Sequence, residues 1–323
     1  MTLATVPEID AELDALEQAV VEACAALVRA AETAHRRGAD GVSNAAGHND
    51  LQSAAVSTDG DAALQNRPSH PTNRDTHAAD SVTDWDAESW YLPEDFAVPP
   101  HCIPVRADVR FAPWDAIVSA AGGNYDAIVM DPPWQLATAN PTRGVALGYQ
   151  QLSDELILSL PIERLQHDGL LLIWVINAKY KTALDMFDRW GYRLVDELAW
   201  VKLTVHRRLA KNHGFYLQHA KETCLVGIKC ASGWPPTVRR GVETDVIRSE
   251  RRGQSQKPDE LYEWVERVVP NGKYLEIFAR KNNLRNFWVS LGNEVTGESF
   301  EKALPPAVRQ QLLSQMENGD AAK

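Results

Sequence analysis

The sequence is poor in cysteine, in long apolar runs and in positive charge. Its 323 residues include four cysteines, none in a C-x-x-C pair, which excludes a disulfide framework and a zinc site of the usual spacing. No run of about eighteen apolar residues occurs, and the acidic N-terminus lacks the basic and apolar regions of a secretory signal. We therefore expect an intracellular protein with no membrane segment, no metal ion and reduced, mostly buried thiols. These thiols are Cys24, Cys102, Cys224 and Cys230.

The formal net charge is −11, whereas proteins that bind nucleic acid unaided usually present a positive surface. Two stretches nevertheless concentrate basic side chains. The first contains Lys202, His206, Arg207, Arg208, Lys211 and His213, and the second contains Arg239, Arg240, Arg248, Arg251 and Arg252. Charge alone fits ordinary solvated loops as well as a nucleic-acid-binding patch. Binding of nucleic acid would thus need a local patch of this kind or a basic partner.

Composition divides the chain into three parts: 1–37, 38–84 and 85–323. The first is rich in alanine and charge, and its apolar residues recur at spacings of three and four, which predicts a helix with one apolar seam. Acidic residues precede basic ones along it, as the helix dipole favours. The seam consists of Leu13, Leu16, Val20, Ala23, Leu27, Ala30 and Ala34. It fits a partner chain as well as packing on its own domain.

The segment 38–84 is rich in small polar residues and has few large apolar ones, so we expect a disordered linker. From 85 onwards, β-rich runs alternate with helical stretches, which predicts an α/β domain. The runs 125–130, 169–176 and 273–279 read as buried parallel strands, and 178–190 and 258–268 as crossover helices. Ligands of such sheets bind beyond the carboxyl ends of the strands.

The first of these strands leads directly into the motif Asp131-Pro132-Pro133-Trp134. An aromatic amine such as N6 of adenine is a poor nucleophile and needs desolvation and orientation. The carboxylate of Asp131 can accept one amine hydrogen and the carbonyl of Pro132 the other, which aims the lone pair outward. The two prolines stiffen the turn, and Trp134 offers a ring on which a flipped base can stack. A plain strand-end turn would explain the prolines but not the whole combination.

The motif and its surroundings resemble the MT-A70 family of adenine-N6 methyltransferases over roughly 105–294. The likeness is carried by WVINAKY (174–180), GFYLQHAKE (214–222), RRGQSQKP (251–258) and LEIFARKNNL (275–284), which resemble most the ciliate DNA-methylating branch. The resemblance implies a Rossmann-like S-adenosylmethionine-dependent methyltransferase fold of the permuted type, with the DPPW strand before the cofactor loop. That order accounts for the missing early glycine fingerprint, because Gly122-Gly123 precedes a strand and reads as a turn.

The resemblance also implies roles for individual residues. Asp131, Pro132, Pro133 and Trp134 are the implied catalytic residues. The implied cofactor contacts are Asp108, Val109, Asp131, Lys257, Arg280, Asn282, Asn283, Asn293 and Glu294. The implied substrate contacts are Tyr149, His219 and Glu222, to which we add Lys202, Arg207, Arg208 and Lys211 from the first basic stretch. Lys257 or Arg280 could pair with the methionine carboxylate of S-adenosylmethionine.

Two positions depart from the messenger-RNA branch of the family: Asn282 replaces a histidine and Glu294 a glutamine. The sequence also lacks paired CCCH zinc fingers. We therefore expect DNA as the substrate, with RNA as the alternative. The resemblance further implies a catalytically degenerate MT-A70-like partner, basic DNA-binding accessory subunits and a nuclear location. Two other readings stay open, a catalytically silent scaffold subunit and a methyltransferase acting on protein or a small molecule.

Overall fold

The computed structural model describes Gln18 and residues 97–135, 151–212, 216–253, 255–297 and 299. The predicted linker and Tyr149 lie outside these residues. So does the predicted N-terminal helix, apart from Gln18, which is helical and exposed. The description below concerns the α/β part of the chain.

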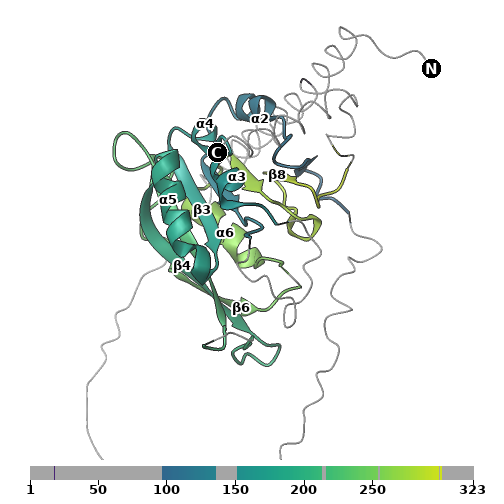
Figure 1. Cartoon of the computed structure of the whole chain (residues 1–323), viewed down its shortest axis with the longest axis vertical. Coiled ribbons are helices and arrows are strands. Elements are labelled where there is room, and N and C mark those ends of the chain that lie inside the picture. Colours follow the sequence, from purple (N-terminus) through teal and green to yellow (C-terminus); the bar gives the residue numbers. More distant parts are fainter. Residues whose placement is uncertain are drawn as a thin grey trace, which may run out of the picture.

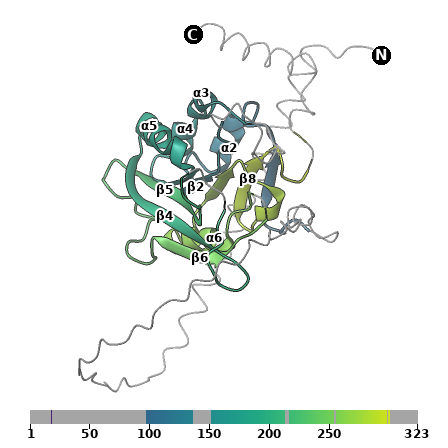
Figure 2. The same ribbon diagram turned by 60° about the horizontal axis from the view of Figure 1, so that its bottom comes forward.

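One mixed sheet of eight strands organises this part of the chain, in the order β1-β8-β7-β2-β3-β5-β4-β6. Strands β1, β8, β7, β2 and β3 are parallel, β5 is antiparallel to β3 and β4, and β6 is parallel to β4. The bounds are β1 Ile103–Arg106, β2 Ala127–Met130, β3 Gly169–Val175, β4 Arg193–Leu203, β5 Lys221–Lys229, β6 Val246–Glu250, β7 Tyr274–Ile277 and β8 Trp288–Gly292. The predicted α/β class and the parallel central strands β2, β3 and β7 are confirmed. Figure 2 shows the long strands β4 and β5 beside one another.

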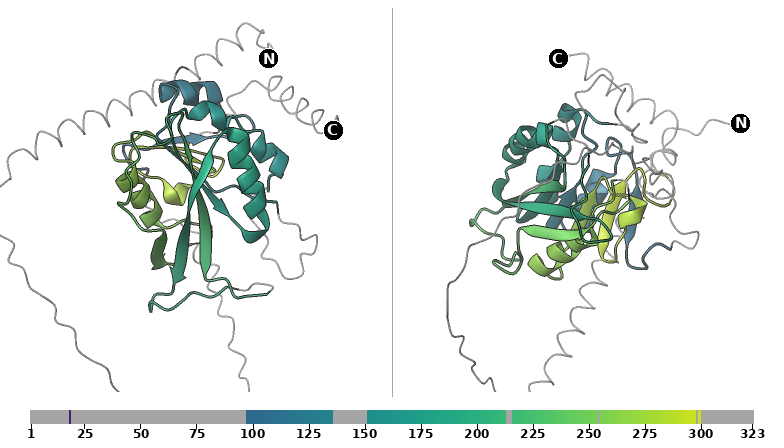
Figure 3. Two further views of the ribbon diagram at one scale, coloured as in Figure 1. Left: turned by 90° about the vertical axis from the view of Figure 1, so that its left-hand side faces the viewer. Right: turned by 90° about the horizontal axis from the view of Figure 1, so that it is seen from below.

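Helices cover both faces of the sheet. The bounds are α2 Trp114–Ala120, α3 Asp154–Leu158, α4 Ile162–Leu165, α5 Tyr180–Trp190 and α6 Asp259–Val268, with 3-10 turns η3 Asn177–Lys179 and η4 Lys281–Asn283. Helices α3, α4 and α5 lie on one side of the strands and α6 on the other (Figures 1 and 3). Two buried apolar clusters, one on each face, make up the core. Among the described helices, none is long and apolar enough to cross a membrane.

The two crossover helices predicted from the sequence are α5 and α6. Helix α5 buries Ala183, Met186, Phe187 and Trp190, whose spacing places them on one face, and it ends at Gly191 in the left-handed conformation (φ 78°). Helix α6 follows Pro258, carries acidic residues in its first turn and buries Leu261, Tyr262, Val265 and Val268. Both predicted helices are thus confirmed within a few residues.

The turn predicted at Gly122-Gly123 is also confirmed, because both glycines have positive φ angles of 64° and 80°. The thiols Cys102, Cys224 and Cys230 are free. Only Cys224 among these three is buried, so the expectation of mostly buried thiols is wrong for the described cysteines.

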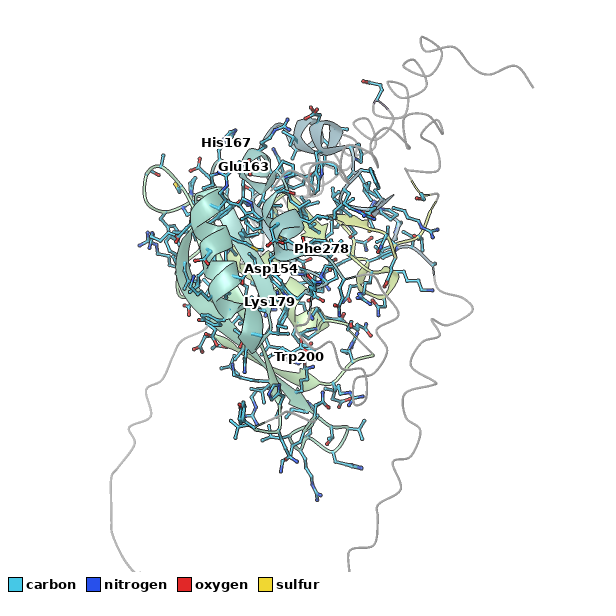
Figure 4. The ribbon with its side chains drawn as sticks, in the orientation of Figure 1. Asp154, Glu163, His167, Lys179, Trp200 and Phe278 are labelled. Atoms are coloured by element: carbon cyan, nitrogen blue, oxygen red, sulfur yellow. The ribbon has the colours of Figure 1, made fainter. Side chains whose placement is uncertain are left out.

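The carboxyl ends of the parallel strands meet at one edge of the sheet. In Figure 4, His167, which precedes β3, lies near the top of the folded part, and Lys179, which follows β3, lies well below it, so that edge is on the Lys179 side. An ion pair at this edge joins the Nζ atom of Lys179 to Asp154 at 2.7 Å, and it fixes α3 against the start of α5. The strand ends of this edge carry the residues of the candidate site.

Gly292, the last residue of β8, brings that strand against the chain that follows β7. A Cβ atom at this position would lie 2.2 Å from the carbonyl oxygen of Ala279. We expect Gly292→Ala to lower the free energy of unfolding by about 1–3 kcal/mol, because backbone cannot move aside as a side chain can. Thermal unfolding would measure this. Gly241→Ala is the control, since its φ of 64° brings strain but its Cβ would meet no atom within 4 Å. Equal losses in both variants would contradict the steric argument.

Candidate active site

Four parallel strands contribute the chain segments that surround one pocket. Asp131 follows β2, and residues 278–280 follow β7, the neighbour of β2 in the sheet. The strand order turns at this pair, since the chain continues from β2 towards β3 on one side while β7, β8 and β1 lie on the other. Ligands of open α/β sheets bind at such a switch point.

The pocket has apolar walls and a polar rim. Its lining consists of Ala107, Asp108, Val109, Asp131, Pro133, Leu152, Phe278, Ala279, Arg280, Gly292, Asn293 and Glu294. Six of the predicted cofactor contacts are in this set, namely Asp108, Val109, Asp131, Arg280, Asn293 and Glu294. The structure therefore brings together residues that are as far apart in sequence as 108 and 294.

Beside the pocket, four charged side chains form an alternating network. The Nζ atom of Lys257 lies 2.9 Å from Oδ2 of Asp131 and 3.2 Å from Oε2 of Glu222. The other carboxylate oxygen of Glu222 accepts a hydrogen bond from Lys202. The strand topology explains the meeting, because the start of antiparallel β5 and the end of β4 lie at the same edge as the end of β2. We call Asp131, Lys257, Glu222 and Lys202 the charge network.

The network keeps Lys257 and Glu222 ionised. Burial alone would lower the pKa of the Lys257 ammonium, but Asp131 and Glu222 outweigh it and raise the pKa above its ordinary value. Burial likewise opposes ionisation of Glu222, yet the charges of Lys257 and Lys202 lower its pKa to about 2. The ammonium of Lys257 also lies 5.0 Å from the centre of the Trp174 ring, a cation–π contact. Asp131 thus faces the pocket as a carboxylate whose position is fixed by Lys257.

Lys257 and Asn283, both predicted as cofactor contacts, have other partners in the structure. Asn283 is buried, and its side-chain amide donates to the backbone carbonyl of Lys257 at 3.1 Å and accepts from its N–H at 3.4 Å. Neither residue lines the pocket. Asn283 positions Lys257, and Lys257 positions Asp131, because the amide and the ammonium are already occupied by protein groups.

The carbonyls of the DPPW turn are partly engaged. The Pro132 carbonyl accepts the N–H of Trp134 at 2.8 Å, and the Pro133 carbonyl accepts that of Leu152 at 2.9 Å. A carbonyl oxygen has two lone pairs, so Pro132 keeps one for a further donor. The turn is therefore rigid but still offers an acceptor beside Asp131.

Trp134 anchors this turn instead of presenting an open ring. Its side chain is 6% exposed, and its indole N–H donates to the carbonyl of Trp174 at 3.0 Å. Because Trp174 lies at the end of β3, the bond joins the DPPW turn to the neighbouring strand. The predicted stacking surface is corrected here, because a ring buried to this extent leaves little face for a base.

Replacing Trp134 with phenylalanine tests the anchor. Phenylalanine keeps an aromatic ring but has no N–H group, so the Trp174 carbonyl loses its donor. We therefore expect the free energy of unfolding to fall by about 1–2 kcal/mol. Chemical denaturation would measure this. Trp190→Phe is the matched control, because the Trp190 indole donates to the Leu158 carbonyl away from the turn. We expect only Trp134→Phe to disturb ligand binding in the pocket, and an equal disturbance in both variants would contradict the anchoring role.

The rim of the pocket carries groups that suit a zwitterionic ligand. Arg280 pairs with Glu294 at 3.1 Å, and Asp108 is held by the guanidinium of Arg110. Asn282, predicted as a cofactor contact, does not line the pocket, and among the described residues its buried Oδ1 atom has no hydrogen-bond partner. Phe278 has a φ of 68°, and this strained conformation turns the chain after β7 into the pocket.

The predicted substrate contacts divide into buried and exposed groups. Lys202, predicted as a substrate contact, is 8% exposed and its Nζ atom pairs with Glu222, so it does not share the exposed surface of the first basic stretch. Arg207, Arg208 and Lys211 are exposed on the loop after β4, and Arg207 lies 3.9 Å from Glu250. His219 is also exposed and outside the pocket lining, and its backbone pairs with Asn212. These exposed residues lie on the loop that joins β4 to β5, and Glu222 begins the next strand.

Sequence reasoning missed several residues of this region, among them Leu152, Phe278 and Glu276. Leu152 and Phe278 line the pocket, but an apolar residue gives no chemical signal in a sequence. Glu276 did give one, because it is an acid in the middle of the buried run 273–279. An ionisable residue in such a run needs a partner or a neutral form.

Because folding lowers the pKa of Glu222, the free energy of unfolding depends on pH in the acid range. Its folded pKa of about 2 is below its ordinary value of 4.5, so the native state holds fewer protons than the unfolded state between these values. The stabilisation is present above 4.5, and we expect it to be lost as the pH falls towards 2. Acid titration of unfolding would show a shallower slope for Glu222→Gln than for the parent. Glu163→Gln, at an exposed position, is the control, and an unchanged slope in Glu222→Gln would contradict the argument.

The fold and the site together define a class of protein. A mixed α/β sheet with an aspartate-proline turn at the switch point and a pocket on four strand ends is consistent with a Rossmann-like methyltransferase fold. The permuted order predicted above is also seen, since β2 with Asp131 precedes β7 with the loop 278–280.

The MT-A70 family profile matches residues 125–294, and the chain belongs to this family. It is similar to an Arabidopsis thaliana "N(6)-adenosine-methyltransferase MT-A70-like" (35% identity; 60% of this chain, 26% of the relative). It is also similar to the Homo sapiens "N(6)-adenosine-methyltransferase catalytic subunit METTL3" (36%; 54% and 29%). The similarity extends to the Drosophila melanogaster "N(6)-adenosine-methyltransferase non-catalytic subunit METTL14" (26%; 58% and 50%). The matched region thus spans between about a quarter and a half of these relatives.

Proposed function

We propose that this chain transfers a methyl group from S-adenosylmethionine to the N6 amine of adenine in DNA. The observation that carries the proposal is the Asp131 carboxylate, which lines the pocket and is held at 2.9 Å by Lys257. A fixed carboxylate beside a free carbonyl lone pair is what an amine needs for orientation. The names of the curated relatives, which all specify N(6)-adenosine methylation, support the same chemistry.

The pocket residues fit S-adenosylmethionine. Val109, Leu152 and Phe278 offer apolar surface for a purine, and Arg280 can bind a carboxylate. Asn293 can bind ribose hydroxyls. When bound, the cofactor supplies an activated methyl group, so this chain needs no covalent intermediate of its own.

The chain's own groups then orient the acceptor amine. Asp131 and the Pro132 carbonyl each accept one N6 hydrogen, and the lone pair points into the pocket. The rigid turn, anchored by Trp134 on β3, keeps the two acceptors at a fixed separation. The base enters flipped or unpaired, since N6 cannot reach these acceptors inside a stacked duplex.

The choice of DNA rests on two positions, Asn282 and the pocket residue Glu294. Both differ from the messenger-RNA branch, and Glu294 forms an ion pair with Arg280 that a glutamine could not form. RNA is the second candidate, and the word adenosine in the relatives' names favours it. Base chemistry is the same in both polymers.

We further propose that the chain acts in a nuclear complex with a catalytically degenerate MT-A70-like subunit. The similarity to a relative named as a non-catalytic subunit supports a pairing of this kind. The net charge of −11 supports the need for basic accessory subunits that bind DNA, with Arg207, Arg208 and Lys211 as this chain's own contribution.

The test is transfer of labelled methyl to matched DNA and RNA oligonucleotides, with the full chain and its co-purified partners. The Asp131→Ala chain in the same complex is the blank. We expect label on adenine N6 of DNA. Label on RNA alone would establish the second candidate, and label on protein would show a methyltransferase of another class. If no label depended on Asp131, the chain would be a catalytically silent scaffold subunit.

A further inference from the structure

Glu276 is a buried acid outside the charge network, on the strand next to the one that leads to Asp131. It lies in β7, whose four residues are all buried, and it is 5% exposed. In the sheet, Glu276 pairs with Val129 of β2. Asp131 is two residues beyond Val129, so its side chain leaves the same face of the sheet, diagonally opposite Glu276. The mechanism derived above makes no use of this residue.

One oxygen of Glu276 has a partner and the other has none. The hydroxyl of Tyr262 on α6 donates to Oε1 at 2.8 Å. The Oε2 atom is buried and has no hydrogen-bond partner in the described part of the chain. Burying an ionised carboxylate whose oxygen has no hydrogen-bond partner costs free energy, whereas burying the protonated carboxyl group costs much less.

The charged groups that face Glu276 come from every neighbouring segment. Asp131 follows β2, Lys257 precedes α6 and Arg280 follows β7, and all three act electrostatically on Glu276. Tyr262 covers it from α6, and Cys102 lies beyond Ser290, the residue that pairs with Glu276 on β8. The charge network itself contains two carboxylates and two ammonium groups, so it is formally neutral. An ionised Glu276 would add a negative charge that the network does not balance.

The balance of these effects keeps the side chain neutral near pH 7. The pKa of Glu276 is raised to about 8: burial and the Asp131 carboxylate raise it, while the Tyr262 hydrogen bond and the charges of Lys257 and Arg280 oppose this. A small change in nearby charge is therefore enough to ionise it at neutral pH.

We propose that Glu276 makes the pocket distinguish the positively charged methyl donor from its neutral product, by losing its proton to solvent when the donor binds. The inference rests on the proposed function. Transfer to an amine held by Asp131 requires the donor sulfur in line and close to Asp131, whose charge already acts on Glu276. A sulfonium is a cation and the thioether left after transfer is neutral, so only the donor favours the carboxylate form. Once transfer has removed the positive charge, Glu276 takes a proton back from solvent.

The sign of the pH dependence follows. Because donor binding lowers the pKa of Glu276, donor affinity rises as the pH rises and levels off near 8, where the ligand-free side chain ionises. The rise is about tenfold for each unit by which binding lowers the pKa. Product affinity should not follow this curve.

The experiment is titration calorimetry of the full chain with S-adenosylmethionine and with S-adenosylhomocysteine at pH 7, in two buffers of different ionisation enthalpy. We expect release of up to about one proton with the first ligand and none with the second. Glu276→Gln should abolish the difference, while Glu163→Gln, an exposed acid on α4, should retain it. Infrared difference spectra should show a protonated carboxyl signal that is lost when the donor binds and is absent in Glu276→Gln.

The outcomes separate the two proposals. Binding of both ligands with equal proton exchange in the parent chain would overturn the role of Glu276 and leave the proposed function intact, and this comparison does not depend on whether a variant folds. Proton release that persists in Glu276→Gln would overturn it as well. Binding of neither ligand would overturn the proposed cofactor, and with it this inference.

Discussion

Alanine at position 131 is expected to lower kcat for methyl transfer by about 10³-fold. The substitution removes the acceptor that orients the amine, and loss of one well-placed polar group at a reacting centre has effects of about this size. Asp131→Asn should lie between the parent and Asp131→Ala, because the amide keeps an acceptor oxygen but loses the charge that Lys257 pairs with. Single-turnover kinetics with saturating donor would measure the chemical step directly.

Asp154→Ala provides a matched control for this prediction. Asp154 is also a partly buried aspartate at the carboxyl edge, and it pairs with Lys179 at 2.7 Å, but it does not line the pocket (Figure 4). We expect it to lower stability without a comparable loss of kcat. If the two variants lost kcat in proportion to their stability, Asp131 would be a structural residue and the assignment of its carboxylate to the amine would fail.

The strands that carry the catalytic turn were predictable because they are short, apolar and buried on both faces. The runs at 125–130, 169–176 and 273–279 could hardly form anything else, and each continues into polar residues where a parallel sheet collects its ligands. Helix α5 was equally clear, since Gly191 marks its end. The fold class and the position of Asp131 followed from these patterns.

The antiparallel half of the sheet was not predicted. The burial of Lys202, which lies on one of its strands, was missed for the same reason. Strand β4 has an exposed beginning and a buried end, so its composition resembles a charged loop. The alternation Leu198, Trp200, Lys202 would have placed Lys202 on the inward face, since residues two apart share a face of a strand. The partner that makes this burial tolerable, Glu222, lies on another strand, and pairing between distant strands is not visible in one sequence.

The roles of Asn283 and Lys257 show a second limit. Their residue types fit a cofactor contact as well as a structural one, and only the positions of the atoms decide between them. The amide of Asn283 is taken up by the Lys257 backbone, and the Lys257 ammonium by two carboxylates. Pattern and resemblance located the correct region of the chain, but they could not say which polar groups face the ligand and which hold those that do.

Loss of Lys257 is expected to destabilise the protein strongly. It is 8% exposed and is the shared counter-ion of Asp131 and Glu222, so Lys257→Met leaves Asp131 without this cation and Glu222 with Lys202 alone. Removing one partner of a buried ion pair costs about 3–5 kcal/mol, and we expect the free energy of unfolding to fall by that amount, as measured by chemical denaturation. Methyl transfer should be lost as well, because Asp131 is no longer held.

The control is Lys221→Met, which removes an exposed ion pair with Glu197 and should cost under about 1 kcal/mol. The double variant Lys257→Met with Glu222→Gln should recover part of the lost stability, because it removes one of the stranded charges, but it should not recover activity, since Asp131 still lacks its cation. A destabilisation no larger than that of Lys221→Met would show that the two carboxylates do not depend on Lys257. Recovery of activity in the double variant would show that the harm came from Glu222, and that Lys257 does not position Asp131.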